Sequence, residues 1–142
     1  RELSMNTHSN AKILLVGLLV SGIMNLLIVP MGSLAGEDMT GYQEIFSSML
    51  QFDVSFVGSW VIHSIISAIV LLATVRSLRL EGIQPQQQGI IVGLTLYIIA
   101  HTFLIPLLGG DDVVMRSQLT ISFFTHILFG VFVSNILENT ID

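Results

Sequence analysis

The sequence predicts an all-α integral membrane protein, a bundle of four transmembrane helices. Apolar residues make up 52% of the 142 residues and charged residues only 11%, whereas an ordinary soluble domain has about 25% charged residues. The mean hydropathy is +0.82. This composition excludes a water-soluble globule, and it also excludes a disordered chain, because disorder requires low hydrophobicity and high charge.

Charge, cysteine content and the lack of catalytic motifs exclude further classes of function. The formal net charge of −5 argues against a surface that binds nucleic acid. Cysteine is absent, which excludes disulfides, cysteine-ligated metals, iron–sulfur clusters and thiol catalysis. The sequence has no G-x-S-x-G or H-E-x-x-H motif, the usual signatures of serine and zinc hydrolases. We therefore expect no catalytic residues.

Four segments are long and apolar enough to cross a bilayer, since about 30 Å of hydrocarbon requires about 20 residues of helix. We expect the spans at about 13–32, 54–75, 89–109 and 119–137. None of them contains Asp, Glu, Lys or Arg, as the cost of a charge in lipid requires. The predicted transmembrane domain covers 13–137, with a polar tail at 1–12 before it and a short tail at 138–142 after it.

The loops between the spans differ in character. The middle loop, Glu81 to Gln88, contains Gly and Pro but no apolar pattern, so it is predicted to be a plain connector. In the first outer loop, apolar residues between Tyr42 and Leu50 recur at spacings of three and four. This spacing predicts a short amphipathic helix that either lies on the membrane interface or packs over the mouth of the bundle.

Basic residues predict the orientation in the membrane. Four of the five flank the same ends of the spans: Arg1, Lys12, Arg76 and Arg79. Arg116 alone lies on the other side. Because basic residues favour the cytoplasm, both termini are predicted to be cytoplasmic, and a prokaryotic cytoplasmic membrane is the expected location.

The two halves of the chain match as an internal duplication. Three positions of the first span match the third at one constant offset: Gly17 with Gly93, Asn25 with His101, and Pro30 with Pro106. In the second and fourth spans, His63 matches His126. Because each half holds two helices, both halves cross the membrane in the same sense. We therefore predict two tandem helical hairpins related by a pseudo-twofold axis along the membrane normal.

Each span also carries one face of small or polar residues, since residues four apart share a helix face. The four faces are Gly17, Ser21 and Asn25; Ser55, Ser59, His63 and Ser67; Gly89, Gly93, Tyr97 and His101; and Ser122, His126, Gly130 and Ser134. In lipid, small residues let helices approach and polar residues find partners between helices. The candidate polar cluster is His63, His101, His126 and Asn25, which lie at a similar distance from the outer ends of their spans.

Four interpretations of this cluster remain open. The imidazoles could be hydrogen-bonded contacts between helices, or His63 and His126 could bind a b-type haem or another tetrapyrrole. Small residues would then flank the macrocycle: Ser59, Ser67, Ser122 and Gly130. The three histidines, with His101, could instead bind copper or zinc. Finally, the polar faces could pass protons, ions or a small solute.

Two prolines lie near the outer ends of their spans. Pro30 and Pro106 each lack a backbone N–H, which leaves the carbonyl four residues earlier, at Leu26 or Thr102, without its helical donor. The sequence therefore predicts either a kink that opens the outer half of the bundle or a helix end at the interface.

Short motifs in these helices resemble the YagU-like family of small four-helix membrane proteins. Gly58-Ser-Trp60-Val-Ile-His63 resembles the family's Trp-x-x-His signature, and Thr125-His126-Ile-Leu-Phe-Gly130 resembles its His-x-x-x-Gly segment. Further similarity lies in Val29-Pro30-Met31-Gly32, Gly89-Ile-Ile-Val-Gly93 and Ile105-Pro106. The chain departs from the family at Ser67, where Gly is frequent. The resemblance implies a four-helix fold and emphasises two of the histidines, but it implies no reaction.

With few loops and no catalytic set, the sequence favours a non-catalytic accessory or structural subunit. Its expected partners are the lipid bilayer and other membrane subunits or further copies of itself, and no nucleic acid. The alternative is a stand-alone protein that uses the histidines for a cofactor or for transport.

The predicted orientation can be tested by thiol labelling, because the chain has no cysteine of its own. A cysteine introduced at Asp38 or Asp112 should react with an impermeant maleimide added outside intact cells. A cysteine at Gln86, in the predicted cytoplasmic loop, should react only after the membrane is permeabilised. The reverse pattern would contradict the orientation.

Overall fold

The computed structural model of the chain describes residues 4–34, 36, 41–107 and 116–140. Its elements in order are η1 (Met5–Thr7), α1 (Asn10–Leu34), α2 (Gly41–Leu50), α3 (Phe56–Ser77), α4 (Pro85–Ile99), η2 (Ala100–Leu104), α5 (Ile105–Leu107) and α6 (Arg116–Asn139). The described residues form helices, turns and loops without any β-strand.

Within the described part of the chain, four helices are long and apolar enough to cross a membrane, in agreement with the predicted number of spans. They are Asn10–Leu34, Phe56–Ser77, Pro85–Leu107 and Leu119–Asn139. The third begins four residues before its predicted start at Gly89, because Pro85 suits the first turn of a helix, where a backbone N–H needs no helical partner. Hydropathy locates the part that crosses lipid, whereas helical hydrogen bonding continues into the polar ends.

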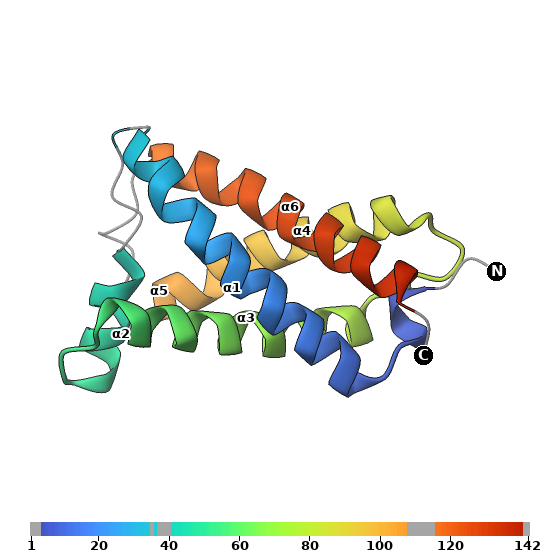
Figure 1. Ribbon diagram of the computed structural model, residues 1–142, viewed down its shortest axis with the longest axis horizontal. Coiled ribbons are helices and arrows are strands. Elements are labelled where there is room, and N and C mark those ends of the chain that lie inside the picture. Colours follow the sequence, from blue (N-terminus) through green and yellow to red (C-terminus); the bar gives the residue numbers. More distant parts are fainter. Residues whose placement is uncertain (1–3, 35, 37–40, 108–115, 141–142) are drawn as a thin grey trace.

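The long helices lie side by side, with the two ends of the chain at one end of the bundle and α2 and α5 at the other (Figure 1). The most extensive contacts join α4 to α6, followed by those that join α1 to α3. Further contacts join α1 to α6 and α3 to α4. The helices therefore contact one another in the cyclic order α1, α3, α4, α6.

Glycines bring the backbones of α4 and α6 into direct contact. A Cβ atom added to Gly89 would lie 2.6 Å from Cα of Val131, and one added to Gly93 would lie 2.7 Å from Cα of Ile127. From the other side, a Cβ added to Gly130 would lie 2.7 Å from the backbone nitrogen of Gly93. The G-x-x-x-G spacing of α4 is thus a packing motif, as is usual between membrane helices.

A glycine also brings α1 and α3 close together, but the register of this contact differs from that between α4 and α6. A Cβ added to Gly17 would lie 2.8 Å from Cδ2 of Leu71 and 3.2 Å from Cα of Ala68. The duplication predicted from the sequence aligns Ala68 with Val131, whereas Gly93 packs against Ile127, one helical turn earlier. The contacts of the two helix pairs therefore differ by about a turn, and the pseudo-twofold symmetry stays a prediction.

The segment before the first span is packed, in contrast to the expected polar tail at 1–12. From Ser4 onward it is described, and Ser4, Met5 and His8 are buried. Met5 joins the apolar core between the long helices. The reason is that the Met5 side chain packs between the helix ends. The polar groups beside it, the Met5 N–H and the Asn6 side chain, form hydrogen bonds there.

The predicted amphipathic helix is present as α2, at the opposite end of the bundle. Ile45 and Phe46 are buried, and α2 packs against α3. The loop that follows is tied back to the helix: the side chain of Gln43 donates to the Val54 carbonyl at 2.9 Å, and the Val54 N–H donates to Oγ of Ser47 at 3.0 Å. α2 and the loop that follows it therefore form an ordered polar cap beside α3 at this end of the bundle.

The glycine contact between α4 and α6 leads to a stability prediction. Gly130→Ala should lower the free energy of unfolding by about 1–3 kcal/mol, a typical cost of overpacking, because the new methyl group meets backbone that cannot rotate away. Gly22→Ala is the matched control, since a Cβ there meets none of the described atoms within 4 Å. Unfolding in detergent measures both. Equal stability of the two variants would contradict the direct backbone contact.

Candidate functional site

The candidate site lies between α4 and α6, beside the glycine contact and toward the end of the bundle covered by α2. His101 comes from η2, Tyr97 from α4, and Ser122 and His126 from one face of α6. All four side chains are half-buried. The close approach at Gly93, which reaches the backbone of His126, brings these side chains within reach of one another.

The hydroxyl of Ser122 bridges the two imidazoles. Its Oγ lies 2.7 Å from Nε2 of His101 and 3.2 Å from Nδ1 of His126. The same Nδ1 lies 2.7 Å from the backbone carbonyl oxygen of Ser122. Three polar groups from two helices thus form one hydrogen-bonded chain.

The partners in this chain fix the position of its protons. Because a carbonyl oxygen can only accept a hydrogen bond, the short contact to the Ser122 carbonyl requires Nδ1 of His126 to carry a proton. The neutral ring of His126 then has a free lone pair on Nε2. The Ser122 hydroxyl then accepts from the Nδ1–H of His126, and it can donate its own proton to Nε2 of His101 when His101 is the Nδ1–H tautomer. With His101 in that tautomer, the hydrogen bonds all run in one direction, from His126 to His101.

Tyr97 packs against both imidazoles. Its ring centroid lies 4.6 Å from that of His101 and 5.8 Å from that of His126, and the two imidazole centroids are 6.0 Å apart. Phe123 meets the other side of Tyr97 edge-on at 5.3 Å. Aromatic contacts of this kind restrict the rotation of the rings they surround.

The helix that carries His101 changes its winding at this point. Residues Ala100–Leu104 form a π-helix, η2, in which the N–H of Ile105 bonds to the carbonyl of Ala100. Single π-turns inside helices are frequent at functional sites. This π-turn was not among the features predicted from the sequence, although Pro106, which disturbs helical hydrogen bonding, is a signal for it. By contrast, α1 continues through Pro30 to Leu34.

The structure places the other two members of the predicted cluster differently. Asn25 is buried and donates from Nδ2 to Oγ of Ser64 at 3.2 Å, a bond that joins α1 to α3. Ser64 was not among the predicted residues because it lies outside the four-residue stripe of its helix. His63 lies close enough to His126 to interact with it electrostatically. The hydrogen-bonded cluster is therefore centred on α4 and α6.

The supporting residues divide into those that line this site and those that do not. Ser122 and Tyr97 line it. Ser59 is fully buried and donates to the carbonyl of Phe56 in its own helix at 2.8 Å, and Ser67 is half-buried.

The residues present do not fit the cofactors considered above. A tetrapyrrole needs open space beside its ligands, but the face of Gly130 is filled by the backbone of Gly89 and Gly93. For copper or zinc, the described residues hold no group of three or more His, Asp or Glu side chains arranged to bind a metal ion. The geometry instead suits groups that exchange hydrogen bonds.

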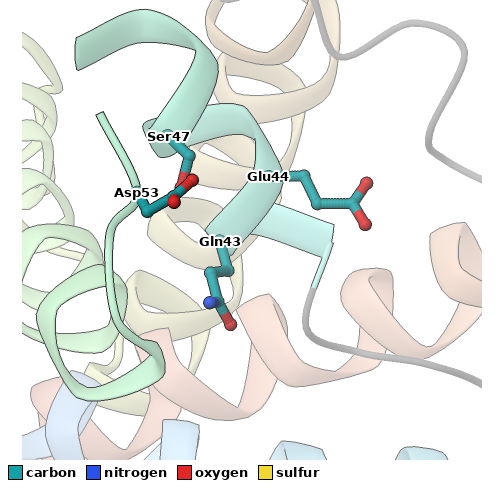
Figure 2. Close-up of a pocket in the computed structure, with 4 residues that line it drawn as sticks. All are labelled: Gln43, Glu44, Ser47 and Asp53. Carbon is teal, nitrogen blue, oxygen red and sulfur yellow. The ribbon is translucent and has the colours of Figure 1, made fainter. Parts of the chain in front are cut away.

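A polar hollow lies outside the apolar part of the bundle, beside α2. Gln43, Glu44, Ser47 and Asp53 line it. Figure 2 shows the Glu44 carboxylate directed away from the Asp53 carboxylate. The hollow lies in the polar cap at the same end of the bundle as His101.

The comparisons with known proteins give no match. No protein-family model matches the chain, and no curated protein or solved structure is significantly similar to it. The resemblance of its short motifs to YagU-like proteins therefore stays a prediction.

The proton positions deduced above can be observed by nitrogen NMR of histidine-labelled protein at mildly alkaline pH. His126 should be the Nδ1–H tautomer. Ser122→Ala should leave this tautomer unchanged, because the backbone carbonyl remains, but should shift the Nε2 signal of His101, which loses its donor. An Nε2–H tautomer at His126 would contradict the deduced hydrogen-bond direction.

Proposed function

We propose that this chain is a non-catalytic integral membrane protein that relays protons through the outer half of the bundle. One observation carries the proposal: the chain from His126 through Ser122 to His101, with separations of 3.2 and 2.7 Å. Imidazole and hydroxyl groups can each accept one proton while releasing another. Ionisable residues within membrane spans are costly, so they are functional candidates by default.

The depth of these groups supports a relay. At about 1.5 Å per residue, Ser122 lies about 9 Å and His126 about 15 Å along α6 from its first residue. The hydrocarbon is about 30 Å thick. The hydrogen-bonded groups His126, Ser122 and His101 therefore connect the middle of the bundle to a level close to the outer end of the bundle.

The direction of the hydrogen bonds suggests the order of the proton steps. A proton arriving at Nε2 of His126 makes that ring a cation, and its Nδ1 proton moves to Oγ of Ser122. The Ser122 hydroxyl releases its original proton to Nε2 of His101, which loses its Nδ1 proton to an acceptor at the outer end. The hydrogen-bonded groups return to their starting state when the Ser122 hydroxyl rotates and each imidazole again carries its proton on Nδ1 instead of Nε2.

Orientation and assembly complete the proposal. With both termini cytoplasmic, as the basic residues favour, the relay delivers protons toward the outer side of a prokaryotic membrane. Packing against other membrane subunits or copies of itself remains the second role favoured by the sequence. The many apolar side chains exposed on the helices, such as Leu19 and Ile23 at 58% each, suit lipid or such partners equally.

Proton flux into vesicles tests the relay. Purified protein in liposomes that enclose a pH-sensitive dye should pass protons faster than protein-free liposomes when a potassium gradient with valinomycin drives them. Ser122→Ala should reduce this flux about tenfold or more, because the methyl group breaks the chain between the two imidazoles.

Thr95→Ala is the matched control for this experiment. Thr95 lies on α4 and its hydroxyl bonds only within its own helix, to the Ile91 carbonyl at 2.8 Å, so its removal should leave the flux unchanged. Equal flux in Ser122→Ala and the natural chain would refute the relay. Absence of proton flux both in the natural chain and in a Met5→Ser, Arg76→Gln variant, which opens the opposite end of the bundle, would favour the subunit role instead.

A further inference from the structure

We infer that residues 4–8, here called the N-terminal strap, form a gate that closes the end of the bundle opposite the histidines. The strap lies where both ends of the chain are found in Figure 1. That the gate admits protons rests on the proposed function. The closure of this end of the bundle rests on separate contacts.

Polar contacts attach the strap to two different elements. The N–H of Met5 donates to Oε1 of Gln88 at 2.9 Å, and Nε2 of the same Gln88 donates to the Ile83 carbonyl at 2.6 Å. Nδ2 of Asn6 donates to the Leu78 carbonyl at 2.8 Å. The strap thus joins the end of α3 to the start of α4, which are separated along the chain only by a short loop.

Arg76 adds a third attachment. Its guanidinium donates to the carbonyl oxygens of Asn6 and His8 at 2.5 and 2.6 Å, and to Oδ1 of Asn10 at 2.6 and 2.9 Å. Hydrogen bonds from a charged donor are stronger than neutral ones. One side chain at the end of α3 therefore holds most of the length of the strap and the start of α1.

Beneath these attachments, the side chain of Met5 closes the interior. It is 2% exposed and belongs to one apolar cluster with Leu80, Val92, Val133 and Leu137, each at most 1% exposed. These residues come from α4, α6 and the loop after α3. An apolar constriction of this kind blocks water and ions by excluding water. The histidine chain is consequently separated from the solution at this end by the cluster and the strap.

The construction of the strap allows it to open without unfolding the bundle. Its one regular element, η1, is three residues long, and it is capped locally, with the Thr7 hydroxyl donating to the Ser4 carbonyl at 2.7 Å. Segments held by a few side-chain hydrogen bonds open locally at a smaller free-energy cost than the core. Releasing Arg76 removes contacts to the strap while leaving the helix–helix glycine contacts intact.

Thiol accessibility tests the gate independently of proton transfer. Val133 is fully buried on α6 beneath the strap, and because the chain has no cysteine, Val133→Cys provides a single thiol. In permeabilised proteoliposomes, a charged methanethiosulfonate reagent should modify it slowly. Adding Arg76→Gln and Met5→Ser should accelerate modification at least tenfold.

Two controls accompany this measurement. Arg79→Gln replaces an exposed arginine three residues further on, in the loop after α3, and should leave the rate unchanged. Far-ultraviolet circular dichroism of each variant should show the helical content of the natural chain, which separates opening of the strap from unfolding.

The outcomes distinguish the gate from the relay. Faster modification together with a several-fold higher proton flux supports both, whereas faster modification with unchanged flux supports the gate and counts against the relay. An unchanged modification rate in the folded Met5→Ser, Arg76→Gln variant overturns the gate, whatever the flux.

Discussion

The backbone contact between α4 and α6 determines most of what is specific about this bundle. Gly93 and Gly130 remove the side chains that would otherwise separate the two helices. At that separation the hydroxyl of Ser122 reaches the ring of His101 on the neighbouring helix. The tightest helix contact and the polar site are thus consequences of the same absence of Cβ atoms.

The two ends of the bundle are built from opposite chemistry. Toward the end where α2 lies, imidazoles, a hydroxyl and a phenol occupy the space between α4, η2 and α6. Toward the chain ends, the interior is filled by aliphatic side chains such as Leu137 and Val92, with Met5 inserted among them. Hydrogen-bonded chains can conduct protons, whereas an aliphatic core cannot, and the proposed relay and gate both depend on this asymmetry.

Departures from regular helix geometry and from symmetry occur where the polar groups lie. The π-turn at Ala100–Leu104 carries His101, while the corresponding part of α1 is a continuous helix through Pro30. Asn25, which the sequence aligns with His101, bonds to α3 through Ser64. If the halves arose by duplication, they have diverged most in the register and polar partners of their helices, as expected when one pair acquires a chemical role and the other a structural one.

The sequence by itself determined the four spans, because membrane insertion depends on the summed transfer free energy of about 20 neighbouring residues. It also placed His101, Ser122 and His126 on polar faces, since helical periodicity is a local property. Only the tertiary structure decided which partner each polar group has, because a rotation or slide of one helix by a fraction of a turn exchanges one partner for another. The strap was beyond sequence reasoning for the same reason: the polarity of residues 1–12 suggested a tail, and the sites that hold Met5 and Asn6 exist only once the ends of α3 and α4 come together.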